Sequence, residues 1–133
     1  MNLIIEARGD IVEREELLNG TQIVTIEGAS DDGGWSVGGT ISWNIGLDVR
    51  GVEGDVTFTR ADGAAIFGTV TGGRVEARDA EDAGVGLRLE YDVDGGSGAL
   101  EGARGAATAE GVLSGESFRC AWRVTLEDAL RSS

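Results

Sequence analysis

The chain contains no histidine, no proline and no lysine, and it has a single cysteine among its 133 residues. The absence of histidine excludes serine–histidine and cysteine–histidine catalytic pairs, histidine metal ligands and histidine general bases. One cysteine, Cys120, cannot form an intramolecular disulfide or a cysteine-cluster metal site. Because Cys120 falls on the apolar positions of a strand pattern, a buried, inert thiol is expected there rather than a nucleophile. The sequence therefore predicts neither a metal nor another cofactor.

Long apolar runs and an excess of basic charge are also missing. No stretch approaches the length of a membrane-spanning helix, and no basic segment precedes the short apolar run at residues 3–5 as it would in a signal peptide. Twenty-four acidic residues against 11 arginines give a net charge of −13. Such a charge repels nucleic acids and anionic membranes. We therefore expect a cytoplasmic protein that binds neither nucleic acid nor membrane.

Glycine, in contrast, is abundant, with 23 residues, and 41% of the chain is hydrophobic. This composition is typical of many short strands joined by tight turns and does not suit a helical bundle. The length corresponds to a single domain, residues 1–133, with one hydrophobic core.

Alternation of apolar and polar residues marks the strands. It is clearest where Leu87, Leu89, Tyr91 and Val93 share one face. Further strands are predicted at residues 3–8, 21–27, 35–49, 52–60, 64–71, 74–79, 106–113 and 116–127. Asp62-Gly63 indicates a type I′ hairpin turn, and residues 80–84 an acidic turn. Eight to ten antiparallel strands with one apolar face each predict an all-β fold, a small closed barrel of the calycin type with about eight strands.

Residues 10–18 allow two interpretations. Asp10 followed by Glu13 fits a helical capping box, with Asn19-Gly20 ending the helix. Asn19-Gly20 is equally a strong two-residue hairpin signal that would join two strands. The glycine-rich remainder of the chain favours the hairpin. The last residues, 126–133, form either one helical turn or a frayed end.

One stretch resembles a known family. It reads Gly95-Gly96-Ser97-Gly98-Ala99-Leu100-Glu101-Gly102-Ala103-Arg104-Gly105 and is similar to the GGTGxFxGARG segment of allene oxide cyclases, dirigent proteins and related bacterial barrels. Residues 54–68 resemble the strand–turn–strand before that segment, and residues 118–126 the closing strand. The resemblance covers residues 52–126. It implies the barrel fold, a cyclase or isomerase activity, and a homo-oligomer, either a dimer or a trimer. The acidic and polar catalytic residues of the plant enzymes have no counterpart here.

Candidate site residues follow from the apolar face that the strands would turn inward. Arg60 and Tyr91 fall on that face and are the predicted catalytic residues, with Tyr91 or a buried carboxylate such as Glu27 or Glu53 moving a proton. The predicted substrate-binding residues are Trp43, Phe58, Leu89, Phe118 and Trp122. An arginine and a tyrosine among aromatic side chains would orient a polar oxygen of an apolar ligand. The alternative is that Arg60 lies at the barrel rim and Tyr91 is a core residue.

Three functions remain open from the sequence. The first is a cofactor-independent cyclase or isomerase that folds a small hydrophobic substrate of bacterial specialised metabolism and excludes water from it. The second is a non-catalytic carrier of a hydrophobic ligand. The third is a barrel filled by its own side chains that serves as a structural or assembly subunit. The volume of the interior separates the third from the other two.

Overall fold

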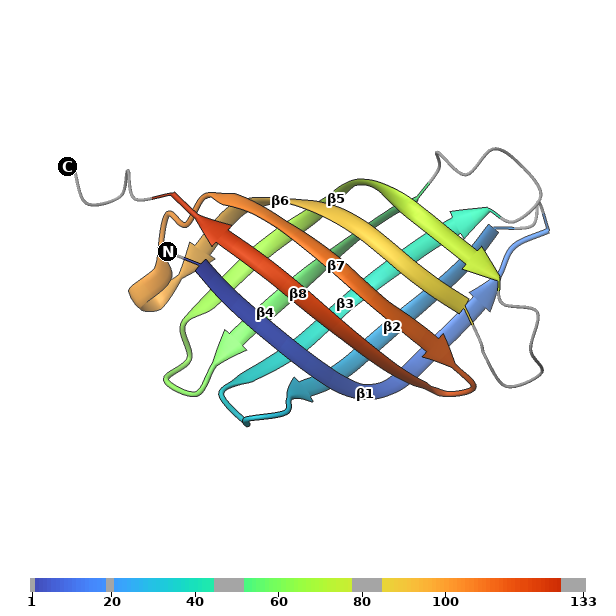
Figure 1. Ribbon diagram of the computed structural model, residues 1–133, viewed down its shortest axis with the longest axis horizontal. Helices are drawn as coiled ribbons and strands as arrows, with labels where there is room; N and C mark the ends of the chain where they lie inside the picture. The colour runs from blue at the N-terminus through green and yellow to red at the C-terminus, as the bar shows by residue number, and fades with distance from the viewer. Residues whose placement is uncertain (1, 19–20, 45–51, 78–84, 128–133) are drawn as a thin grey trace.

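The computed structural model describes residues 2–18, 21–44, 52–77 and 85–127. Eight antiparallel strands follow one another in chain order around a closed barrel, and the last pairs with the first (Figure 1). They are β1 (Asn2–Glu16), β2 (Thr21–Ser30), β3 (Trp35–Asn44), β4 (Glu53–Arg60), β5 (Ala65–Ala77), β6 (Val85–Ser97), β7 (Gly105–Ser114) and β8 (Ser117–Leu126), with a 3-10 helix η1 (Gly98–Leu100) before β7. The predicted all-β, closed, eight-stranded antiparallel barrel is confirmed. In the described residues, no helix has the length and apolar character needed to span a membrane.

The two-residue period of the sequence decides which side chains enter the barrel. In β6, Leu87, Leu89, Tyr91 and Val93 are buried, and the residues between them are exposed. β8 alternates in the same way and buries its even-numbered residues from Phe118 to Leu126. Because successive side chains of a strand point to opposite faces, this alternation leaves one apolar lining and one polar outer wall.

Residues 10–16 are strand, so the helical interpretation is wrong. β1 continues to Glu16 and pairs with β2 along its second half, with a bulge between Ile11 and Glu13. The hairpin interpretation is correct, although the Asn19-Gly20 turn itself lies outside the described residues. The local capping pattern is overridden because the apolar residues of β2 need a partner strand to close the wall.

The β4–β5 turn differs from the predicted type I′. A type I′ turn requires positive φ at both central residues, and among the described residues only glycines, including Gly63 at 90°, have positive φ. The Asp62 carboxylate instead accepts a hydrogen bond from the Ala64 N–H at 3.0 Å, and Gly63 N–H donates to the Arg60 carbonyl at 2.9 Å. The turn is therefore longer and is held by the Asp62 side chain.

Two other predicted boundaries shift. The short strand expected at residues 74–79 is the end of β5, which reaches Ala77. β3 is described to Asn44, so the rest of the strand predicted to residue 49 lies outside the described residues, as do the acidic turn at residues 80–84 and residues 128–133.

Candidate functional site

Side chains from opposite walls meet inside the barrel. β4 and β8 are four positions apart in the closed eight-strand order. Nevertheless, the ring centroids of Phe58 on β4 and Trp122 on β8 are 5.4 Å apart, in an edge-to-face arrangement. Phe118, four residues before Trp122 on the same strand, packs against the same indole with ring centroids 6.5 Å apart. At this level, aromatic rings from opposite walls meet across the interior.

The structure places all five predicted substrate-binding residues on the inner face. Phe58, Leu89 and Trp122 are almost fully buried, and Phe118 and Trp43 are buried to a slightly smaller extent. Phe58 and Phe118 both pack against the Trp122 ring, so the three residues form an aromatic cluster. Contact with a substrate at these residues stays a prediction.

The two predicted catalytic residues do not share a site. Tyr91 is buried and pairs with Val70 in the middle of β5, whereas the Arg60 backbone bonds to Ala64, six residues earlier. Six residues of strand span roughly 20 Å. The Arg60 guanidinium lies at the end of β4, 38% exposed, and bonds both carboxylate oxygens of Asp62, the shorter contact being 2.7 Å. This placement matches the rim alternative for Arg60.

Electrostatics agree with this separation. The Arg60 guanidinium, helped by the Ala64 N–H, lowers the pKa of the Asp62 carboxyl to about 2, and the same ion pair raises the pKa of Arg60. Burial raises the pKa of Tyr91 far above its ordinary value of 10.0. A tyrosine with such a pKa stays protonated, so Tyr91 is suited to donating a hydrogen bond and not to removing a proton. Of the proposed carboxylates, Glu27 and Glu53 are exposed.

One buried donor has no partner. The indole N–H of Trp122, a residue that is 0% exposed, makes no hydrogen bond. The Tyr91 hydroxyl is its polar neighbour. Burial raises the pKa of Tyr91, and the nearby Trp122 indole lowers it in part. The indole N–H and the hydroxyl nevertheless do not meet hydrogen-bond geometry. Cys120 faces the same interior, and burial raises the pKa of its thiol to about 12. Trp122, Tyr91 and Cys120 thus each contribute a polar group to the lining near the aromatic cluster.

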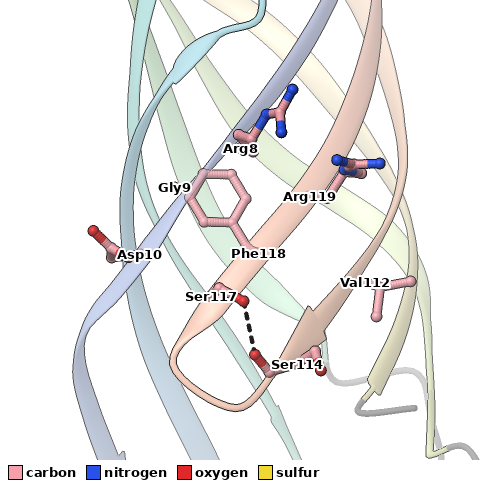
Figure 2. A pocket seen from close by; sticks show the side chains of 8 residues that line it. All are labelled: Arg8, Gly9, Asp10, Val112, Ser114, Ser117, Phe118 and Arg119. Atoms are coloured by element: carbon pink, nitrogen blue, oxygen red, sulfur yellow. Dashed lines mark hydrogen bonds between the residues drawn. The ribbon is translucent and has the colours of Figure 1, made fainter. Parts of the chain in front are cut away.

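The outer wall carries a groove that the sequence did not reveal. Its volume is about 420 Å³, and its lining includes Arg8 and Asp10 from β1, Val112 and Ser114 from β7, and Ser117 and Arg119 from β8 (Figure 2). Arg8 and Arg119 are directly opposite each other in the β1–β8 register. Both arginines are exposed on the polar outer face, but only the register between the first and last strands brings them together.

Charge in this groove is incompletely balanced. The Arg8 guanidinium bonds the Asp31 carboxylate at 3.0 Å. The Arg119 guanidinium makes no hydrogen bond or ion pair with any described residue. Farther along the same wall, Glu110 bonds Arg88 at 2.9 Å, and both Arg88 and Arg123 lower its pKa. Arg119 is thus a cation without a counter-ion among the described residues of a strongly acidic chain.

A second feature of the wall is a free strand edge. The β1–β8 pairing ends where Asp10 meets Ser117, just before the Ile11 N–H donates to the Glu116 carbonyl at 2.7 Å. Beyond this point residues 13–16, here called the β1 edge, pair with β2 only, as far as the described strands show. Three of these four residues are exposed glutamates, and Val12 and Leu17 beside them are 53% and 39% exposed. One side of the β1 edge therefore has no partner strand among the described residues, and its Arg14 guanidinium donates to the Gly115 carbonyl at 2.8 Å.

No cluster of three or more acidic or cysteine side chains able to hold a metal ion occurs in the described part of the chain. Comparison with protein-family models, with curated proteins and with solved structures gave no match to this chain.

Proposed function

We propose that this protein is a filled β-barrel that acts as a non-catalytic binding subunit through its outer wall. The observation that carries the proposal is the contact between Phe58 and Trp122, which come from opposite strands of the barrel. An eight-stranded barrel is only wide enough to be filled by side chains or to hold one small ligand. A 5.4 Å separation between two rings leaves no space for a substrate between them.

The arrangement of polar groups supports the same choice. A cyclase or isomerase site needs an acid, a base or an oriented cation facing the substrate. Arg60 is instead bound to Asp62 at the end of β4, and Tyr91 is kept protonated by burial. Under this proposal, the resemblance to allene oxide cyclases implies a shared barrel and not a shared chemistry.

The β1 edge is the surface we assign to the partner. Exposed strand edges bind extended segments by adding a strand to the sheet, with main-chain hydrogen bonds supplying affinity. Glu13, Glu15 and Glu16 would face one another if two copies paired edge to edge, and like charges placed opposite each other are destabilising. A second copy is therefore disfavoured. The occupant that fits is an extended, basic segment of another protein.

An experiment on the interior tests whether the barrel is filled. Tryptophan fluorescence of the wild type is expected to show no response to benzene and indole, because the rings of Phe58 and Phe118 already pack against Trp122. In Phe58→Ala the removed ring leaves an apolar cavity, which such ligands enter when it is dry, so a response is expected. Phe58→Leu, with a smaller cavity, serves if Phe58→Ala does not fold. Saturable quenching in the wild type would overturn the filled interior.

A peptide experiment tests the edge. The probe is a ten-residue peptide of alternating lysine and valine, with binding followed by fluorescence anisotropy at physiological ionic strength. We expect the triple variant Glu13→Gln, Glu15→Gln, Glu16→Gln to weaken binding at least fivefold. The matched control replaces Glu53, Glu90 and Glu101, which are also exposed, and removes the same charge from other places. Equal weakening in both variants would show attraction by net charge alone and would contradict the assignment.

The unpaired Trp122 N–H supports a second candidate, a carrier or cyclase for an apolar ligand. Buried donors are nearly always hydrogen-bonded in proteins, by protein or by an ordered ligand or water. A ligand oxygen accepting from both Trp122 and Tyr91 would satisfy this donor. The test is turnover of a polyene epoxide by the wild type, Tyr91→Phe and Arg60→Ala. Turnover that is lost in Tyr91→Phe would replace the filled-barrel proposal with this one. The dimer or trimer that the resemblance implies is measured by light scattering.

A further inference from the structure

The pairing of Arg8 with Arg119 is unfavourable unless something else neutralises it. Directly opposite residues on neighbouring strands have Cβ atoms about 5 Å apart, and like charges there destabilise the sheet. Both side chains are exposed and project from the same outer wall. The chain has more than twice as many acidic as basic residues, so an acidic partner for Arg119 would be easy to supply. The position holds a second arginine instead.

The local charge count favours an anion. Asp31 neutralises one guanidinium of the pair through Arg8. The only other acid in the lining of the groove is Asp10, which lies opposite Ser117 in the register. Figure 2 shows Asp10 on the side of β1 away from Arg119, with its carboxylate directed outward. Glu6, Asp31 and Glu110 line the adjoining hollow together with Arg119, but no ion pair joins any of them to its guanidinium, so the Arg119 donors stay available to an anion.

The volume and the lining of the groove indicate what kind of ligand fits it. Its 420 Å³ lies within the range of small-molecule sites, which is about 300–1,000 Å³. Val112 gives the groove an apolar wall beside Arg119, and the Ser117 hydroxyl donates to the Ser114 carbonyl at 2.9 Å, which leaves its oxygen lone pairs and not its proton facing the groove. Positive charge is therefore supplied by the arginines alone, and space remains for an organic group next to the anion.

We propose that this groove binds the oxyanion of a small organic molecule between the guanidiniums of Arg8 and Arg119. A guanidinium presents a planar fork of donors that matches carboxylate and phosphoryl oxygens. Arg8 keeps Asp31 on its Nε atom, which leaves its terminal nitrogens for the ligand, while Arg119 contributes its whole fork. The inference is independent of the β1 edge and of the filled interior, because it concerns other residues of the wall.

The test is a titration followed by the backbone amide signals of β1 and β8 in two-dimensional NMR spectra, at constant ionic strength. Inorganic phosphate and acetate are the two probes, and they distinguish a phosphoryl from a carboxylate ligand. We expect saturable shifts confined to residues near Arg8 and Arg119 for at least one probe. Absence of saturable shifts with both probes would overturn the proposal.

Three variants make the result specific. In Arg119→Gln, the affinity for the probe that binds is expected to fall roughly tenfold, because one charge-assisted contact is lost. Arg104→Gln is the matched control, because Arg104 is also exposed and its guanidinium makes no hydrogen bond or ion pair with a described residue. This variant should bind the probe as tightly as the wild type. Asp31→Asn releases Arg8 and should tighten binding. Equal losses in Arg119→Gln and Arg104→Gln, or no gain in Asp31→Asn, would contradict a site built on this pair.

Discussion

Trp122 combines two opposing contributions at one position. Its ring fills the centre of the barrel between Phe58 and Phe118, and burying such a ring is strongly favourable. Its N–H, however, is buried without a partner, and an unsatisfied buried donor costs about 1–3 kcal/mol. The residue is therefore stabilising through its surface area and destabilising through one atom.

Replacement of Trp122 by phenylalanine separates these contributions. Trp122→Ala should lower the free energy of unfolding by about 3–5 kcal/mol. Trp122→Phe should cost less than half as much, because the loss of ring area is partly offset by removal of the unpaired donor. Guanidinium unfolding followed by circular dichroism measures both. A similar cost for the two variants would show that the N–H is hydrogen-bonded in solution.

Cys120 should make the fold sensitive to alkaline pH. Its thiol has a pKa of about 12 in the folded protein against an ordinary value of 9.0. A folded pKa raised in this way gives stability that is complete below pH 9 and is lost as the pH rises from 9 toward 12. Burial acts in the same direction on Tyr91, at higher pH.

The free energy of unfolding, measured from pH 7 to 11, should therefore fall less steeply above pH 9 in Cys120→Ala than in the wild type. Ser117→Ala in the same strand is the control and should retain the wild-type slope. An unchanged slope in Cys120→Ala would mean that the thiol is more accessible to water than its burial indicates.

At the scale of the strand, the alternation of residue types was sufficient to predict β6 and β8, because each has one wholly apolar face. The β1–β2 hairpin was predicted with an alternative, since Asp10 and Glu13 also fit a helix start. The turn type at Asp62-Gly63 was wrong, because a dipeptide pattern does not include the hydrogen bonds that the Asp62 side chain forms with the backbone.

A glycine on the inner face of a strand permits the neighbouring strand to approach closely. Gly39 and Gly38 are neighbours in β3 with opposite orientation. A Cβ on Gly39 would collide with the Asp55 carbonyl and lie 3.2 Å from Val56 Cα, whereas one on Gly38 would have only the Ile26 carbonyl within 4 Å, at 3.9 Å. Gly38 and Gly39 therefore have the same sequence context, but a Cβ has room only at Gly38.

Gly39→Ala should accordingly lower the free energy of unfolding by about 1–3 kcal/mol, the usual cost of overpacking. Gly38→Ala should change it by less than about 0.5 kcal/mol in either direction. Thermal unfolding of the pair gives the comparison. Equal effects would mean that β3 and β4 lie farther apart than the structure has them.

At the scale of the molecule, the sequence predicted the inner and outer faces but not which residues of different strands meet. Arg60 and Tyr91 share the inner face, yet they lie at different heights of the barrel. Arg8 and Arg119 are 111 positions apart and become neighbours only through the closure of β8 on β1. Closure and register are set by packing over the whole lining, which a local pattern does not contain.

Joining the first strand to the last also decides how the barrel responds to mechanical load. Asn2 lies opposite Thr125, so the two ends of the β1–β8 seam that a force would grip are adjacent. A force pulling Asn2 and Thr125 apart acts along the hydrogen bonds between the two strands, because these bonds are perpendicular to the strands. It therefore breaks the bonds one at a time, from Asn2 toward Asp10. A single-molecule tether at these ends should unzip the seam at a lower force than a tether from Asn2 to Ser117, which loads the same bonds together in shear.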